Sequence, residues 1–240
     1  MFNLSILKSE SFKKGIAFST VLNFFSKGLS FCTTILIAYY FGTSLETDIY
    51  FFVLSIITSI SMFITGCTTS VIIPEVMYLN ENGRKDEAMK ITNTILLVFT
   101  ILTAVPAFLF SIIPVQVFSI ISQFSDVTII EHRFYFSISS LLLILITINT
   151  YLKEVLSIYR FFSLPMVISL INSIFIIISI PLLKNHIGMK SVMTGLILGN
   201  SINGVMLVYT LYKYVHWRFN AITFKIPGKF RSRIFYSQAG

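Results

Sequence analysis

Six long apolar runs constrain the fold of this chain more than any other feature. They cover roughly residues 16–41, 49–73, 91–113, 134–152, 164–183 and 192–212. Crossing the hydrocarbon core of a bilayer takes about 20 apolar residues, and inside lipid only helices and closed β-barrels satisfy their backbone hydrogen-bonding groups. Because the runs lack the strict alternation of barrel strands, the sequence predicts an all-α integral membrane protein with about six transmembrane helices.

The composition supports a membrane protein and argues against a soluble domain. Of the 240 residues, 55% are hydrophobic and 12% are charged, whereas soluble domains have about 25% charged residues. The net charge of +8 lies mostly at the ends of the apolar runs, which indicates membrane orientation and predicts no nucleic-acid partner. The sequence has no recognisable catalytic motif and its two cysteines lack metal-ligand spacing, so we expect no enzyme, cofactor or metal.

The positions of Lys and Arg predict how the chain crosses the membrane. The N-terminus, the second and fourth connections and the C-terminal tail hold fourteen of these residues, whereas the other three connections hold three. Since cytoplasmic loops carry the excess of positive charge, both termini are predicted to be cytoplasmic. The chain then divides into a cytoplasmic N-terminal segment (1–15), a six-helix transmembrane lobe (16–212) and a basic cytoplasmic tail (213–240).

One face of the first apolar run is polar. Asn23, Lys27, Ser30 and Thr34 are spaced by four, three and four residues, which places them on one side of a helix. A charged group at mid-bilayer costs about 2.5–3.5 kcal/mol on insertion scales, so this side is expected to face other helices or a wet cavity. Two roles remain open: a cavity wall that meets a polar or anionic substrate, or helix packing in which Lys27 reaches a carboxylate.

Small and amide residues in the later runs predict close helix contacts. Gly195 and Gly199 form a small-xxx-small pair in the sixth run, and Asn203 extends the same face. Asn149 and Asn172 are isolated amides in the fourth and fifth runs, and each is expected to form a hydrogen bond between helices.

The segment SKGLSFCTTILIAYYFGTSLETDIYFF (26–52) resembles the first-span signature of the MurJ/MviN lipid flippases, within the MOP transporter superfamily. That signature has Ser-Arg, then Ala-x-x-Phe-Gly, then Thr-Asp followed by aromatic residues. The corresponding positions here are Ser26, Lys27, Ala38, Phe41, Gly42, Thr47, Asp48, Tyr50 and Phe51. Residues 71–88 resemble the family's second-span end and the loop after it, and 145–177 resemble its fourth-to-fifth span region.

The resemblance implies the N-terminal lobe of a MOP-type flippase in the bacterial inner membrane. The implied substrate is a polyprenyl-diphosphate-linked sugar for peptidoglycan or polysaccharide synthesis. Membrane lipids and a second-lobe chain are further implied partners, because family members form two lobes around a central cavity. The implied cavity residues are Asn23, Lys27, Ser30, Thr33 and Thr34. Thr33 stands where the peptidoglycan-precursor flippases carry an arginine, which leaves a related lipid-linked oligosaccharide as another substrate.

Other functions remain open from the sequence. A polysaccharide or drug exporter of the same superfamily is one alternative, although a cavity for cationic drugs should contain acidic residues and none lies in mid-span. A chain of six spans is also compatible with a truncated product, with half of a two-part assembly, or with a non-transporting remnant or scaffold.

The polar segment at 42–48 separates the first two apolar runs. It is expected to close the first helical hairpin on the outer face. Gly42 permits the turn, while Thr47 and Asp48 are expected to cap the second helix, with Asp48 favoured by the helix dipole. A direct part for Asp48 in gating is the alternative that the resemblance raises. If an Asp48→Asn variant transports normally, Asp48 has no part in gating and capping is its remaining role.

Overall fold

The computed structural model describes residues 12–67 and 72–219. Within these ranges the chain forms nine α-helices and a π-helical turn: α1 (Phe12–Phe41), α2 (Leu45–Cys67), α3 (Ile73–Glu81), α4 (Lys85–Ile112), α5 (Pro114–Ile121), α6 (Asp126–Glu131), α7 (Arg133–Ile158), α8 (Ser163–Ile187), α9 (Lys190–Thr210) and η3 (Leu211–Val215). Six of the α-helices are long and apolar enough to cross a membrane: α1, α2, α4, α7, α8 and α9. The predicted all-α membrane class with six spans is therefore confirmed.

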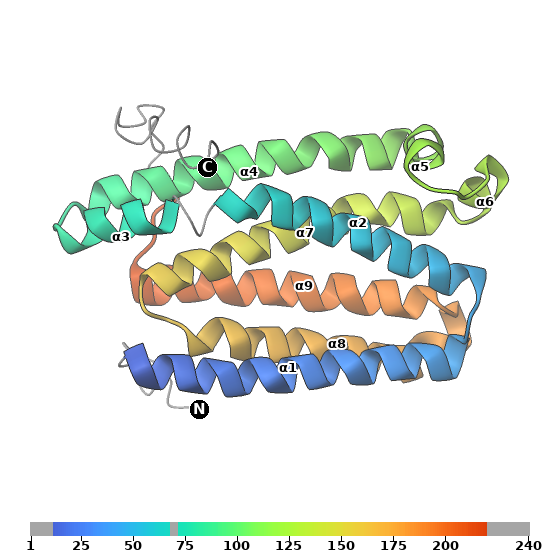
Figure 1. Cartoon of the computed structure of the whole chain (residues 1–240), viewed down its shortest axis with the longest axis horizontal. Helices are drawn as coiled ribbons and strands as arrows, with labels where there is room; N and C mark the ends of the chain where they lie inside the picture. Colours follow the sequence, from blue (N-terminus) through green and yellow to red (C-terminus); the bar gives the residue numbers. More distant parts are fainter. Residues whose placement is uncertain (1–11, 68–71, 220–240) are drawn as a thin grey trace, which may run out of the picture.

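The long helices lie side by side in an elongated bundle (Figure 1). α1 packs along α8, α8 packs along α9, and α9 packs along α7. α7 in turn contacts α2 and α4, so it occupies the centre of the bundle. Half of the apolar window in α7 and in α9 is buried, whereas only 11% of the window in α1 is. α1 is thus the span with most of its surface left open.

Two apolar clusters hold the two ends of the bundle together. One contains Ile49, Phe118 and Phe136 and lies at the end where α1 turns into α2. The other contains Tyr151 and Trp217 and lies at the opposite end, where α3 meets α4. The Tyr151 hydroxyl donates a hydrogen bond of 2.8 Å to the backbone carbonyl of Thr92, so α7 and α4 are also joined by a polar contact in the buried interior.

Short helices occupy segments where the sequence predicted plain connections. The second apolar run was expected to extend to residue 73; α2 spans Leu45–Cys67, the end of the predicted run falls mostly on residues 68–71, which lie outside the described residues, and Pro74 lies in the first turn of α3. Proline fits this position because the first helical N–H groups have no intrahelical partner. The connection expected at 115–133 contains most of α5 and all of α6, and α6 is capped by Ser125, whose hydroxyl accepts from Thr128 N at 3.2 Å.

The small residues of α9 allow a close contact with α8. A Cβ at Gly195 would lie 2.0 Å from Ser179 Oγ, and a Cβ at Gly199 would lie 2.0 Å from Asn172 Oδ1. Both neighbours belong to α8, so the predicted close contact is confirmed.

The two isolated amides behave differently. Asn149 Nδ2 donates a hydrogen bond of 2.8 Å to the Asn200 carbonyl, which confirms the expected bond between α7 and α9. Asn172 instead lies over Gly199, and its side-chain oxygen has no hydrogen-bond partner among the described residues. The amide therefore fills the space that the glycine leaves.

Candidate functional site

The candidate site is the open side of α1, at the edge of the bundle (Figure 1). α1 turns a narrow stripe toward α8, on which Leu29, Thr33 and Ile37 are partly or fully buried. The rest of its circumference is exposed. A helix has about 3.6 residues per turn, so the exposed surface divides into two flanks, one on each side of the α8 contact.

The polar flank consists of Asn23, Lys27, Ser30 and Thr34, and all four residues are exposed. The side chains therefore do not pack into the interior of the described bundle. The Ser30 hydroxyl donates to the Ser26 carbonyl at 3.0 Å, and the Thr34 hydroxyl donates to the Ser30 carbonyl at 3.2 Å. These bonds within α1 lower the cost of a hydroxyl in a membrane span and leave the hydroxyl oxygens able to accept from a ligand.

Lys27 has no ion pair within residues 12–67 and 72–219, where the two salt bridges found are Arg84–Glu87 and Arg160–Glu81. The packing role considered from the sequence, in which Lys27 reaches a carboxylate, thus has no counterpart in the described bundle. An exposed ammonium in the first span, with an amide one turn away, can bind an anionic group.

Thr33 is separated from the other cavity candidates. Its side chain is buried, with 9% exposed, and its hydroxyl donates to the Leu29 carbonyl at 3.0 Å. One residue corresponds to more than a quarter of a helical turn, and this step places Thr33 on the α8 side. The structure therefore brings Asn23, Lys27, Ser30 and Thr34 together and leaves Thr33 out of the group.

The other flank of α1 is apolar. Phe24 and Phe31 are largely exposed, and Phe24, Phe25, Gly28 and Leu29 line a shallow groove with Leu170 and Ile174 of α8. This groove and the polar flank lie on opposite sides of the line along which α1 meets α8. α1 thus has one side suited to lipid chains and one suited to water or a polar ligand.

The turn between α1 and α2 differs from its expected chemistry. Gly42 has φ +58°, a conformation that glycine adopts without strain. The helix cap, however, is Ser44, whose Oγ accepts from Thr47 N at 3.3 Å. Thr47 and Asp48 lie in the first turn of α2, and Thr47 Oγ1 shares a hydrogen bond of 2.9 Å with Ser44 Oγ. Asp48 is exposed in the first turn, where a carboxylate interacts favourably with the helix dipole.

Ser44→Ala should destabilise the start of α2 by about 1 kcal/mol, the usual effect of losing an N-cap side chain. Thr43→Ala is the matched control, because Thr43 is exposed and precedes the cap. Thermal unfolding in detergent, followed by circular dichroism, measures the difference. Equal stability of the two variants would mean that the Ser44 hydroxyl does not cap the helix.

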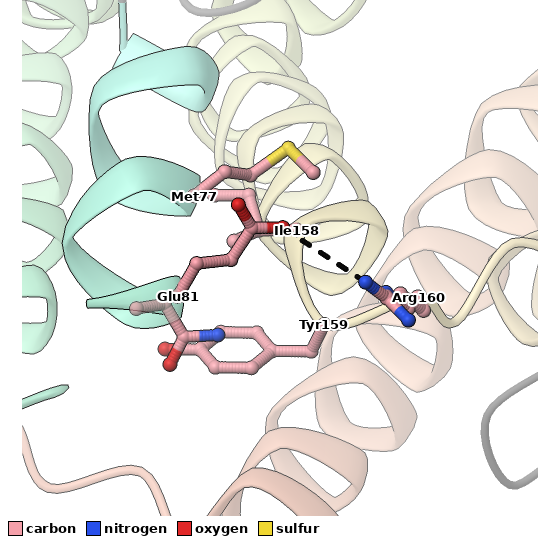
Figure 2. Close-up of a pocket in the computed structure, with 6 residues that line it drawn as sticks. Met77, Glu81, Ile158, Tyr159 and Arg160 are labelled. Carbon is pink, nitrogen blue, oxygen red and sulfur yellow. Dashed lines mark ion pairs between the residues drawn. The ribbon is translucent and has the colours of Figure 1, made fainter. Parts of the chain in front are cut away.

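A second cavity lies at the opposite end of the bundle, between the end of α3 and the turn from α7 to α8. Figure 2 shows Glu81 and Arg160 facing each other across it, with 3.8 Å between Glu81 Oε1 and Arg160 Nη2. Tyr159 forms one wall, and burial raises the pKa of its phenol. Both charged side chains are more than 60% exposed, so the ion pair contributes little stability.

No group of three or more His, Cys, Asp or Glu side chains that could hold a metal ion occurs in the part of the chain that the structure describes. Among the polar groups on the open side of α1, the Lys27 ammonium and the Asn23 amide can donate to an anion, whereas the Ser30 and Thr34 hydroxyls already donate within α1.

Six membrane-length helices, one of them open along a polar flank, define a multi-pass helical membrane protein. A family model described as "Lipid II flippase MurJ" matches residues 37–232. The chain therefore belongs to the MurJ lipid II flippase family, as the resemblance in its first hairpin predicted. The match begins at Ile37, so the polar flank of α1 lies before the matched region.

A curated relative gives the same family. "Probable lipid II flippase MurJ" of Borreliella burgdorferi is 26% identical over 186 residues, which cover 75% of this chain and 37% of that protein. The aligned part of the chain thus spans little more than a third of the length of this relative.

Proposed function

We propose that this chain is the N-terminal lobe of a flippase that moves a polyprenyl-diphosphate-linked cell-envelope sugar from the inner to the outer leaflet of the bacterial inner membrane. Membership of the MurJ family supports this function. The observation that links this function to particular residues is the exposed polar flank of α1, on which Lys27 is unpaired within the described bundle.

The charge of the substrate explains why an unpaired lysine is suitable. A diphosphate that enters a site of low dielectric must be compensated by positive charge and hydrogen-bond donors. Lys27 supplies the charge, and Asn23 supplies donors one turn away. Ser30 and Thr34 extend the polar path along the same flank toward the outer turn.

Orientation follows from charge. The end of the bundle that carries Arg84, Lys85 and Arg160 is proposed to be cytoplasmic, because positive residues are retained on that side. The turn at 42–48 contains no Lys or Arg and is proposed to face outward. In this orientation both termini are cytoplasmic, and the polar flank of α1 crosses the membrane between the two sides.

Transport requires a second bundle facing the open side of α1. Alternating access is largely a rocking of one bundle against another around a fixed site. We propose that a second lobe, in further sequence or in another chain, covers the polar flank and closes the cavity. This lobe and membrane lipids are the proposed partners besides the substrate.

The function is tested in bacterial cells depleted of their own flippase, with the protein expressed as its natural host makes it. The expected result is restored growth together with lipid-linked precursor that an externally added degrading enzyme can reach. Growth without externally accessible precursor would refute the flippase function. Transport of a different lipid-linked oligosaccharide, but not of the peptidoglycan precursor, would reassign the substrate.

A further inference from the structure

The chain changes direction sharply after the sixth span. α9 passes into the π-helical turn η3, and His216 then adopts a left-handed conformation, with φ 55° and ψ 40°. Left-handed backbone costs a residue with a side chain about 1–2 kcal/mol, so local preference does not explain the bend. Figure 1 shows the chain leaving α9 and crossing the end of the bundle toward α4.

Trp217, the only tryptophan in the chain, lies immediately after this bend. Its side chain is 3% exposed and packs in the cluster that contains Ile91 and Tyr151. A buried indole provides a large apolar surface and usually places its N–H against an acceptor. Burial of this ring offsets the strain at His216 and holds the bend.

The side-chain amide of Asn93 on α4 forms hydrogen bonds with both the indole of Trp217 and the backbone of Arg218. Trp217 Nε1 donates to Asn93 Oδ1, and Asn93 Nδ2 donates to the carbonyl of Arg218 at 2.6 Å. Asn93 is itself buried, with 4% exposed. Both ends of its amide are therefore used by residues that follow 124 and 125 positions later.

A further contact, between Arg218 and Met89, also attaches this segment to α4. The backbone N–H of Arg218 lies 3.2 Å from Met89 Sδ, one turn before Asn93 on α4. We define the Trp217 clasp as Met89, Asn93, Trp217 and Arg218. The clasp joins the exit of α9 to the first half of α4, whereas the two helices otherwise both pack on α7.

We propose that the Trp217 clasp is a rigid joint that fixes the direction in which the chain leaves the sixth span, so that residues 216–219 move with the bundle as one body. Its use in transport rests on the proposed function, because a rocking lobe can transmit its motion only through a connection that does not bend. The joint itself does not depend on any substrate.

The single tryptophan makes the joint directly measurable. Fluorescence of the full chain in lipid nanodiscs, without substrate, should show the short-wavelength emission of a buried indole and weak quenching by acrylamide. Long-wavelength emission with strong quenching would overturn the proposal. Since no transport is measured, failure of this result and failure of the flippase function are distinguishable.

Asn93→Ala tests the role of the amide. Alanine favours helix more than asparagine does, so α4 should remain helical while the clasp opens. Acrylamide quenching is then expected to rise several-fold, with emission shifted to longer wavelength. The matched control is Asn82→Ala, because Asn82 is exposed and its side chain bonds the nearby Tyr78 carbonyl, within its own turn of the chain; quenching should stay at the wild-type level. Equal quenching in all three proteins would show that Asn93 does not hold the tryptophan.

A second readout separates a joint from a merely stabilising contact. Spin labels on α4 and at Arg218, an exposed residue that joins the clasp through its backbone, should give a narrow distance distribution in the wild type and a broad one in Asn93→Ala, at unchanged helix content. A broad distribution in the wild type would contradict a rigid joint even if Trp217 is buried.

Discussion

Gly199→Leu and Gly195→Leu are each expected to prevent assembly of the six-helix bundle. A Cβ on Gly199 would lie 3.0 Å from the Asn172 carbonyl oxygen, and one on Gly195 would lie 3.1 Å from Ile176 Cα. These neighbours are backbone atoms, so they cannot rotate away as the Asn172 and Ser179 side chains can. A leucine must therefore separate α8 from α9, and α1 loses its place because it packs on α8.

Alanine gives the measurable form of the same prediction. Gly199→Ala should destabilise the bundle by about 1–3 kcal/mol, the usual cost of overpacking. Gly28→Ala is the matched control, because no atom lies within 4 Å of the Cβ position at Gly28. Glycine destabilises the interior of a helix relative to alanine, so Gly28→Ala should stabilise the protein by about 0.5–1 kcal/mol. Unfolding by denaturant in mixed micelles measures both, and a neutral or stabilising Gly199→Ala would contradict the observed α8–α9 packing.

Lys27→Ala is expected to abolish transport, whereas Lys27→Arg should retain it. A hydrogen bond to a charged group contributes about 1.5–3 kcal/mol, so loss of the ammonium should weaken diphosphate binding by about ten- to a hundredfold. Arginine keeps the charge and offers more donors to phosphate oxygens. The polar flank has no second cation that could compensate.

The assay is externally accessible precursor in depleted cells, normalised to the amount of protein in the membrane. Lys90→Ala is the matched control, because Lys90 is an exposed lysine near the start of α4 and lies outside the polar flank. It should transport at the wild-type rate. Full transport by Lys27→Ala would remove Lys27 from the mechanism, and loss of transport in Lys27→Arg would show that more than positive charge is needed.

The sequence predicts the spans well because bilayer thickness leaves a strong and simple signal. Run length identified all six spans, and the glycine spacing in 195–199 identified the α8–α9 contact. The short helices α3, α5 and α6 were missed because each is too short to show a clear period. Pro74 lies in the first turn of α3, a position to which proline is suited.

The site was only partly predictable, for reasons of geometry. Spacing placed four polar residues on one face, but only the position of α8 shows that this face is open and that Thr33 is not part of it. Ser44 was missed because several hydroxyl residues in the turn are equally plausible caps. The Trp217 clasp joins residues more than a hundred positions apart, and no local pattern in the sequence signals such a contact.

The central claim is that the polar flank of α1 faces water within a transport path. It is tested most directly by single cysteines in a protein whose Cys32 and Cys67 have been replaced, labelled in cells with a charged thiol reagent. Such reagents react with the ionised thiol and therefore need water at the site. Cysteines at Asn23, Ser30 and Thr34 should be labelled, and cysteines at the exposed apolar positions Phe24, Phe31 and Ile35 should not. Protection of both sets alike would contradict the account, because the polar flank would then be closed off from water.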